Sequence, residues 1–307
     1  RLLAELGTTI RQPQGAAAAA WGGFAGVVRL PGAGGALAIT IDGAGTKTVL
    51  ARRLGRDRVI GSDIVVHCAN DLVAAAARPL AFVDYVAMPR LDAVIVRALI
   101  DGMVEECQRL GIPLISGETA EMPGIYLDET YDVVGTMVGV VVREISPDLV
   151  RAGDQVIGLA STGLHTNGYA LARRLVEGMD LLRHVDALGA SPGDALLAPH
   201  RCYAPAVLSL LDALPVHGIA HITGGGLPGN LPRILPPGLG IRLTTTWPVP
   251  PIFGYLQRLG GVDEEEMRRT FNLGVGMTVL TDVGDAARTL ALLERLGETA
   301  WVIGEVA

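Results

Sequence analysis

Residues 37–47 read LAITIDGAGTK, an apolar run that ends in an acid, two glycines and a lysine. We expect residues 37–41 to form a buried strand that ends at Asp42 and leads into a tight glycine turn. Such a turn lets backbone N–H groups approach an anion, while a carboxylate can hold Mg²⁺ and an ammonium group can bind phosphate. The stretch is not a P-loop, because Thr46 separates Gly45 from Lys47. It predicts a phosphate-handling site at the end of a strand.

Lys47 is the only lysine among the 25 Lys and Arg residues of the chain. A chain that uses arginine almost everywhere else retains lysine at this one position. The alternative is an ordinary tight turn with a chance lysine. We favour a phosphate-binding role for Asp42, Gly43, Gly45, Thr46 and Lys47.

The composition favours two domains and argues against nucleic-acid binding. At 307 residues the chain is too long for one ordinary domain, and half of its residues are apolar, which is enough for a large core. The net charge is −7 and there is no basic cluster, whereas a protein that binds duplex nucleic acid normally carries a basic stripe.

The cysteines and the hydropathy indicate a cytoplasmic protein. Cys68, Cys107 and Cys202 are odd in number and lack metal-type spacing, which fits packing roles in a reducing compartment. No apolar run reaches the roughly 18 residues of a membrane helix, and we interpret residues 16–28 as neither a membrane span nor a signal peptide. Because the chain begins at Arg1 rather than Met, we expect an N-terminal segment to be missing.

Strand and helix patterns alternate in both halves, which predicts an α/β or α+β layered fold. The first half is expected to hold a flexible glycine-rich loop at residues 22–35, strands at 37–41, 80–88, 112–116 and 131–142, and helices at 58–77 and 91–110. The second half is expected to hold strands at 155–161, 217–223, 239–246, 275–281 and 300–306, and a helix from Tyr169. The polar segment 143–154 separates the halves, and we place the domain boundary near residue 146.

The predicted helix at residues 58–77 carries a polar stripe on an otherwise apolar surface. Asp63, His67, Asn70 and Asp71 stand at i, i+4, i+7 and i+8, which places them on one face. Two acids on a buried helix cost free energy unless they are paired or bind a cation. We therefore expect Asp63 and Asp71 to serve a metal or phosphate site. The alternative is a solvated face, and for His67 we favour an ordinary core or surface histidine.

Several loops at the ends of predicted strands could bind anions. Glu118 and Glu121 lie in a predicted loop at residues 117–124 and could complete a carboxylate set with Asp42 and Asp71. In the second half, residues 161–168, 221–226 and 271–277 combine glycines with hydroxyl and amide side chains, as anion-binding loops do. The alternative for the first of these loops is helix capping by Thr166 or Asn167.

Six of these segments, in order along the chain, resemble the phosphoribosylformylglycinamidine cyclo-ligase family of purine biosynthesis. They are DGAGTK at residues 42–47, GSDIVVHCANDL at 61–72, GETAEMPG at 117–124, HTNG at 165–168, HITGGG at 221–226 and RTFNLGVGM at 269–277. The departures from the family pattern, at Ser116, Leu227-Pro228 and Leu273, remove no charged group.

The resemblance implies two α/β domains and a homodimer. The N-terminal domain, residues 1–146, is expected to bind ATP and to pair its mixed sheet into a barrel across the dimer. The C-terminal domain, residues 147–307, is expected to be an α/β sandwich that binds substrate. The implied reaction converts formylglycinamidine ribonucleotide and ATP into aminoimidazole ribonucleotide, ADP and phosphate. ATP is needed because phosphorylation turns the formyl oxygen into a leaving group, and such transfer depends on positioning and charge neutralisation.

The resemblance also implies roles for individual residues. Lys47 is expected to contact the ATP phosphates, and Asp42, Asp71 and Glu118 are expected to hold Mg²⁺, supported by Asp63. The expected ATP-binding set also includes Gly43, Gly45, Thr46 and Asn70. The expected substrate-binding set is Ser161, His165, Asn167, Gly168, Thr223, Gly224, Gly225, Gly226 and Asn272. His165 is in addition a candidate proton carrier, so the predicted catalytic residues are Lys47, Asp42 and His165.

Other enzymes and a non-enzyme are the alternatives. Selenophosphate synthetase would carry a reactive cysteine or selenocysteine in the early glycine loop, and no cysteine precedes Cys68. Thiamine-phosphate kinase lacks the GETAEMPG and triple-glycine pattern, and the related amidotransferase that makes the substrate is much longer. A nucleotide-binding regulatory protein that has lost turnover would lack acids or the lysine, which are all present here.

Overall fold

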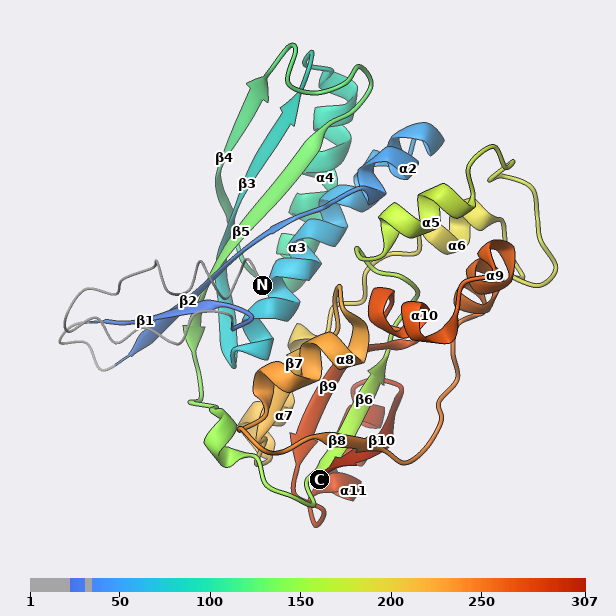
Figure 1. Ribbon diagram of the computed structural model, residues 1–307. Helices are drawn as coiled ribbons and strands as arrows, with labels where there is room; N and C mark the ends of the chain where they lie inside the picture. The colour runs from blue at the N-terminus through green and yellow to red at the C-terminus, as the bar shows by residue number, and fades with distance from the viewer. Residues whose placement is uncertain (1–22, 31–34) are drawn as a thin grey trace.

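A computed structural model describes residues 23–30 and 35–307, which form two five-stranded sheets packed with helices (Figure 1). The predicted glycine-rich loop at residues 22–35 lies partly outside the described residues. Its described part contains the strand β1 (Gly26–Arg29), which pairs antiparallel with β2, so the loop prediction is wrong there. Two adjacent valines in β1 favour extended backbone. The interpretation of residues 16–22 as neither span nor signal peptide falls outside the described residues.

The first sheet has the strand order β1-β2-β5-β3-β4. Its pairs are antiparallel except β3 with β4, which run parallel and are connected through helix α4. A parallel pair needs such a crossover, because the chain must return to the same end of the sheet. The elements of this half are β2 (Ala36–Gly43), α2 (Lys47–Leu54), α3 (Asp57–Ala74), β3 (Ala77–Met88), α4 (Ala93–Leu110), β4 (Leu114–Glu121) and β5 (Asp132–Val141).

Helices α3 and α4 cover one face of the first sheet, and in Figure 1 they lie on the same side of it. Strand residues alternate between the two faces. Ala38, Phe82 and Met137 are therefore buried toward the helices, whereas Ile39 and Ile41 of β2 lie on the opposite face and are exposed. This opposite face is called the open face below.

The two helices of this layer touch backbone to backbone. A Cβ atom on Gly61 of α3 would lie 1.9 Å from the Leu99 carbonyl oxygen, and one on Gly102 of α4 would lie 2.1 Å from the Arg58 carbonyl oxygen. No side chain fits at either position, so both glycines are required by this close approach. The tight packing fixes the orientation of α3, which carries the polar stripe.

The second sheet has the order β7-β9-β6-β10-β8 and is antiparallel throughout. One end of α3 lies beside β7 and α7 of this half, so a helix of the first domain contacts the second domain (Figure 1). The strands are β6 (Gln155–Ala160), β7 (Gly218–His221), β8 (Ile241–Leu243), β9 (Val275–Thr281) and β10 (Ala300–Val306). The helices are η1 (Pro147–Leu149), α5 (Tyr169–Leu175), α6 (Pro192–Leu196), α7 (Ala204–Ala213), α8 (Gly226–Asn230), η2 (Leu231–Ile234), α9 (Pro251–Gly260), α10 (Glu264–Thr270) and α11 (Ala286–Arg295).

Most predicted elements are present, but several details differ from the prediction. Helix α3 ends at Ala74 rather than at residue 77, because Ala76 adopts a φ of 51° and β3 begins at Ala77. Strand β4 continues to Glu121 through the segment predicted as a loop, because its pairing with β3 extends that far. Helix α2 is absent from the predicted elements. Within the described part of the chain, no helix combines the length and apolar character that crossing a membrane requires.

Candidate active site between the two domains

The polar stripe of α3 lies at the junction between the two domains. Asp63, His67, Asn70 and Asp71 are all buried, so the alternative of a solvated face is wrong. Each side chain contacts a residue of the second domain. The stripe is polar because it binds the polar groups of a partner domain.

Lys47 forms a fully buried ion pair with Asp63, with side-chain exposures of 0% and 1%. Its Nζ atom donates hydrogen bonds to Asp63 Oδ2 at 2.5 Å, to the His165 carbonyl at 2.9 Å and to the Ala198 carbonyl at 3.1 Å. The other Asp63 oxygen accepts from the His200 N–H at 2.9 Å. An ammonium group has three N–H donors, so all of them are used inside the protein.

Lys47 and Asp63 thus have protein partners in this geometry, at the positions for which ATP contacts are predicted. Neither residue lines the polar cavity described below, because both are occupied in joining the domains. Contact between Lys47 and phosphate stays a prediction, and it would require the lysine to give up internal hydrogen bonds. Asn70 is engaged in the same way: it donates to the Arg201 carbonyl at 2.9 Å and accepts from the Tyr203 N–H at 2.8 Å.

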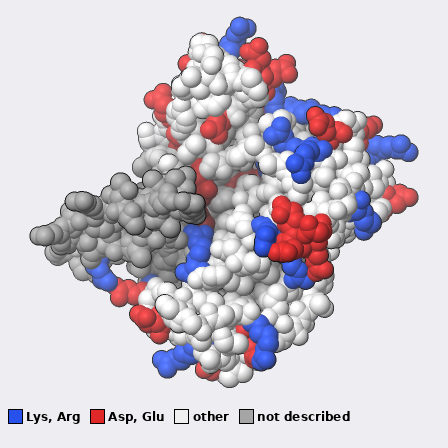
Figure 2. Space-filling model, in the orientation of Figure 1, with Lys and Arg blue, Asp and Glu red and all other residues white. Residues whose placement is uncertain are grey.

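Asp42, His67 and Asp71 line a polar cavity of about 280 Å³ between the domains. Asn167 and Thr223 of the second domain line it too, so two predicted metal ligands and two predicted substrate-binding residues share one cavity. The other lining residues are Gly23, Phe24, Thr40, Ile41 and Arg233. In Figure 2 acidic atoms are visible in a hollow beside the upper lobe of the molecule, and the charges on this face are otherwise of mixed sign.

Histidines hold both acids of this cavity. His67 Nε2 lies 3.4 Å from Asp42 Oδ2, and its Nδ1 lies 2.6 Å from the hydroxyl of Thr166 in the second domain. His221 Nδ1 lies 2.8 Å from Asp71 Oδ1. The acids are thus oriented by partners that come from both domains.

The cavity disfavours negative charge on its acids. Burial raises the pKa of Asp42 from its ordinary value of 3.8 to about 6, with His67 acting in the opposite direction and Asp71 adding to the rise. Burial also raises the pKa of Asp71. When two carboxyl groups share a site, the ionisation of one makes the second harder to ionise, and a bound divalent cation would relieve this repulsion.

Arg233 adds positive charge to the cavity and is absent from the predicted site. Its guanidinium donates to the Gly23 carbonyl at 2.8 Å and to Asn230 Oδ1 at 3.1 Å, and lies 3.9 Å from the centre of the Phe24 ring. It is close enough to Asp71 and Asp42 for their charges to act on it. It stands outside every motif quoted above, so no sequence signal pointed to it.

Glu118 does not join Asp42 and Asp71 within one chain. Across the sheet, Asp42 of β2 pairs with Gly135 of β5, which pairs with Asp84 of β3, which in turn pairs with Gly117 of β4. Three strand spacings, about 14 Å in all, therefore separate β2 from β4 at this level. Glu118 is the next residue along β4, and its side chain therefore points to the open face, away from α3. The predicted metal set of three acids is wrong for a single chain, because Glu118 lies three strands away from Asp42 and points to the opposite face of the sheet.

Other predicted substrate-binding residues hold loops of the second domain. Ser161 donates to Asn272 Oδ1 at 2.9 Å, and Asn272 donates to the Gly163 carbonyl at 2.9 Å. His165 adopts a φ of 60°, unusual for a residue with a side chain, and it does not line the cavity. Strain of this kind often accompanies functional loops.

Four of the six predicted glycines are required by their backbone conformation. Gly45, Gly168, Gly225 and Gly226 all adopt positive φ, and a Cβ atom on Gly226 would lie 2.1 Å from the Arg268 carbonyl oxygen. Gly224 lies beside the Asn167 side chain. Substrate or ATP contacts by Gly43, Thr46 and these glycines stay predictions.

His200 and His221 are not among the predicted site residues, yet both are buried at the domain junction. His221 stands in the HITGGG segment, but its contact with Asp71, 150 residues away, has no local signature. His200 stands in no quoted motif. A larger cavity of about 830 Å³ lies in the second domain around α9 and α10, and no predicted site residue lines it.

The fold and the cavity define a two-domain α/β protein with an acidic, histidine-supported site between its domains. The chain belongs to the AIR synthase related protein family: the N-terminal domain of that family matches residues 22–141 and the C-terminal domain matches residues 151–307.

The chain is similar to curated proteins called phosphoribosylformylglycinamidine cyclo-ligase. The protein of Sorangium cellulosum (strain So ce56) is 48% identical over 295 residues, which cover 93% of this chain and 85% of that protein. The protein of Nitrosococcus oceani is 47% identical over 268 residues, covering 86% and 75%.

Solved structures resemble the fold. The crystal structure of tt0281 from Thermus thermophilus has a TM-score of 0.70 at 21% identity and covers 100% of this chain and 92% of its own. A thiamine-monophosphate kinase from Stenotrophomonas maltophilia K279a has a TM-score of 0.67 at 20% identity, covering 92% and 88%. At such identities the likeness concerns the fold alone.

Replacing Lys47 should show what the buried pair contributes to stability. We expect Lys47→Met to lower the free energy of unfolding by about 3–5 kcal/mol, because it leaves the Asp63 carboxylate buried without its cation. The double variant Lys47→Met/Asp63→Asn should be less destabilised, since no unpaired charge remains. Urea denaturation measures both. Equal stability of the single variant and the wild type would contradict the structural role.

Asp42 should make stability fall as pH rises. Its pKa is higher in the folded protein than in the unfolded chain, so the folded state binds more protons between about pH 4 and 6 and loses stability as pH rises through that window. Asp42→Asn removes this loss. Without divalent ions, the stability of the variant relative to the wild type should increase by up to about 2 kcal/mol between roughly pH 4.5 and 7.5. Parallel pH profiles in urea titrations would show the pKa shift to be absent.

Proposed function

We propose that this protein is an ATP-dependent phosphoribosylformylglycinamidine cyclo-ligase. It closes formylglycinamidine ribonucleotide into aminoimidazole ribonucleotide and releases ADP and phosphate. The observation that carries the proposal is the identity of 42–48% to cyclo-ligases along most of the chain. The cavity between the domains supports it, because acids of one domain and polar side chains of the other converge there.

The donor set of the cavity fits Mg²⁺. Asp42 and Asp71 offer carboxylates, and Thr40, Thr223 and Asn167 offer neutral oxygen atoms. Magnesium prefers oxygen ligands and is usually held by one or two carboxylates together with substrate phosphates. Burial, with a smaller contribution from Asp71, raises the pKa of Asp42, so the cavity disfavours its negative charge and a bound cation would stabilise it. In the proposed site Asp42 and Asp71 hold the metal, and Glu118 of the same chain takes no part.

ATP supplies the phosphoryl group that activates the formyl oxygen for departure. The protein contributes positioning and charge. Asp71 is oriented by His221 and Asp42 by His67, so both carboxylates are held before any ligand arrives. Arg233 brings a positive charge to the cavity, which favours a phosphate group. The cavity of about 280 Å³ is at the small end of ligand sites and suits a phosphate-metal group rather than a whole nucleotide.

In the proposal, Lys47 stabilises this site without lining the cavity. By holding the His165 and Ala198 carbonyls, it fixes the loop that carries Asn167 into the cavity. His165 itself is buried, and burial lowers its pKa well below the ordinary value. Its role as a proton carrier stays a prediction, as does the cytoplasmic location.

A homodimer through the open face belongs to the proposal. Ile41 is 68% exposed on this face, and its neighbour Ile39 is 42% exposed. An apolar sheet face that no helix of the described residues covers is a common kind of protein interface, and two such sheets can close into a barrel that protects their edges. Glu118 lies on the same face, so in a dimer it would point toward the partner subunit.

The activity test uses the purified chain with formylglycinamidine ribonucleotide and Mg-ATP. We expect ADP release that depends on the ribonucleotide, together with a diazotisable aminoimidazole product. Asp71→Asn keeps an oxygen acceptor for His221 but removes the charge, and should lower kcat by at least about 100-fold. Asp212→Asn, an exposed acid of the second domain, is the matched control and should stay within about twofold. Folded wild-type protein that releases no ADP would favour the regulatory binding protein instead.

The dimer is tested by placing a charge on the open face. Ile41→Arg should convert a dimer to a monomer in analytical ultracentrifugation, because a buried unpaired charge costs several kcal/mol. Val94→Arg is the matched control: Val94 is 79% exposed but lies on α4, on the other side of the sheet. A wild-type monomer, or a dimer that survives Ile41→Arg, would refute this interface.

A further inference from the structure

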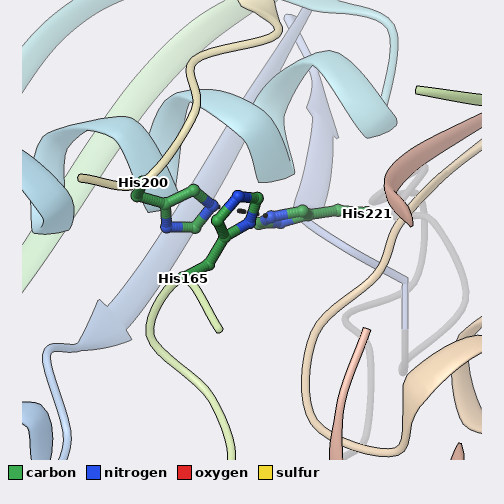
Figure 3. A group of neighbouring side chains, drawn as sticks. All are labelled: His165, His200 and His221. Atoms are coloured by element: carbon green, nitrogen blue, oxygen red, sulfur yellow. Dashed lines mark hydrogen bonds between the residues drawn. The ribbon is translucent and has the colours of Figure 1, made fainter. Parts of the chain in front are cut away.

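Four of the six histidines meet at the domain junction, and one of them differs from the rest in what it faces. His165, His200 and His221 come from separate segments of the second domain and pack against one another (Figure 3). His67 comes from α3 of the first domain, and of the four it alone lines the polar cavity. The contacts of His67 therefore bear directly on the candidate site.

The ring of His67 is held by packing and by a hydrogen bond. It packs edge-on against the rings of His200 and His221, with centroid distances of 5.4 and 5.1 Å. Its Nδ1 lies 2.6 Å from the hydroxyl oxygen of Thr166, and both residues are buried. The packing restricts the tilt of the ring, and the hydrogen bond fixes the direction in which the opposite nitrogen, Nε2, points.

The Nε2 atom of His67 points to Asp42 and lies 3.4 Å from its Oδ2. An ionised carboxylate only accepts hydrogen bonds, so the nitrogen that faces it carries the ring proton. A neutral imidazole has one donor and one acceptor nitrogen, so Nδ1 accepts from the Thr166 hydroxyl. The contact with Asp42 is long for a hydrogen bond, and its strength therefore depends on where Thr166 holds the ring.

The Thr166 hydroxyl is not used to cap the helix that follows it. The N-cap residue of α5 is Gly168, and no side chain makes a cap hydrogen bond there, so the alternative of capping by this hydroxyl is wrong. The loop is held by Lys47 instead, which donates to the carbonyl of His165, the residue before Thr166. The hydroxyl is thereby placed against His67 and is available to orient it.

We propose that Thr166 is a positioning residue of the proposed metal site and acts through His67 on Asp42. The hydroxyl holds the ring, and the ring holds the carboxylate in the cavity that it shares with Asp71. Partners of a metal-ligating carboxylate orient it, and their loss weakens metal binding. Because Thr166 belongs to the second domain, the site is complete only when the domains are docked. The inference rests on the proposed function only in taking Asp42 and Asp71 as ligands of Mg²⁺.

The test measures affinity for a metal ion rather than turnover. Mn²⁺ suits the same oxygen ligands as Mg²⁺, and electron paramagnetic resonance counts the free ion while the purified protein is titrated with Mn²⁺ alone. Thr166→Val keeps the shape of the side chain but removes the hydroxyl. It should weaken Mn²⁺ binding by about 10-fold, the lower end of the loss that follows removal of an outer partner of a metal site. Thr166→Ser keeps a hydroxyl and should retain wild-type affinity.

A control and a double variant show whether the effect passes through the ring. Thr281 is also a buried threonine of the second domain, and its hydroxyl donates to the Pro215 carbonyl at 3.2 Å. It is the last residue of β9, beyond the position that pairs with His221, so Thr281→Val should retain wild-type affinity. The shorter side chain of His67→Asn does not reach Asp42 and should itself weaken Mn²⁺ binding. In that background Thr166→Val should cause no further loss.

Circular dichroism checks that each variant is folded. The proposal is overturned if the wild type binds no Mn²⁺, if Thr166→Val binds it as tightly as the wild type, or if Thr166→Ser or Thr281→Val shows the same loss. A further loss on adding Thr166→Val to His67→Asn would also overturn it, because the hydroxyl would then act without the ring. Wild-type protein that binds Mn²⁺ but releases no ADP would refute the cyclo-ligase activity and leave this inference standing.

Discussion

The buried ion pair between Lys47 and Asp63 is the interaction on which the domain arrangement depends. Lysine is a compact cation with three donors, and here one goes to the acid and two go to carbonyls of the second domain. Asp63 also contacts the second domain, because its other oxygen accepts a hydrogen bond from the His200 backbone N–H. A buried charge is expensive without full pairing, so this pair is stable only when the two domains are docked in this geometry.

The docking decides which polar residues reach the site. Helix α3 presents one face to the second domain, and its position is set by the backbone contact with α4 at Gly61 and Gly102. The deepest residues of the stripe, Asp63 and Asn70, join the domains. His67 and Asp71 reach the cavity, where Asp42 arrives from the end of β2. One helix thus supplies both the interdomain bonds and part of the candidate site.

Local sequence explains much of the fold. The apolar run before Asp42 forms β2, and the β-branched runs at β9 and β10 form strands with the predicted bounds. Elements were missed where local signals are weak or tertiary pairing prevails. Strand β1 follows glycines, and β4 contains a glycine, two glutamates and a threonine that by themselves favour a loop. Both are strands because a neighbouring strand pairs with them.

By itself the sequence determined the polar stripe of α3, the acid at the end of β2 and the loops of Asn167 and Thr223. Residue spacing along a helix and the glycines that end a strand are local properties of the chain. Only the tertiary structure decided which of these groups meet. It buried Lys47 rather than exposing it, turned Glu118 to the open face, and brought His200 and His221 beside residues more than 100 positions away. Such contacts depend on strand register and domain docking, which no local pattern encodes.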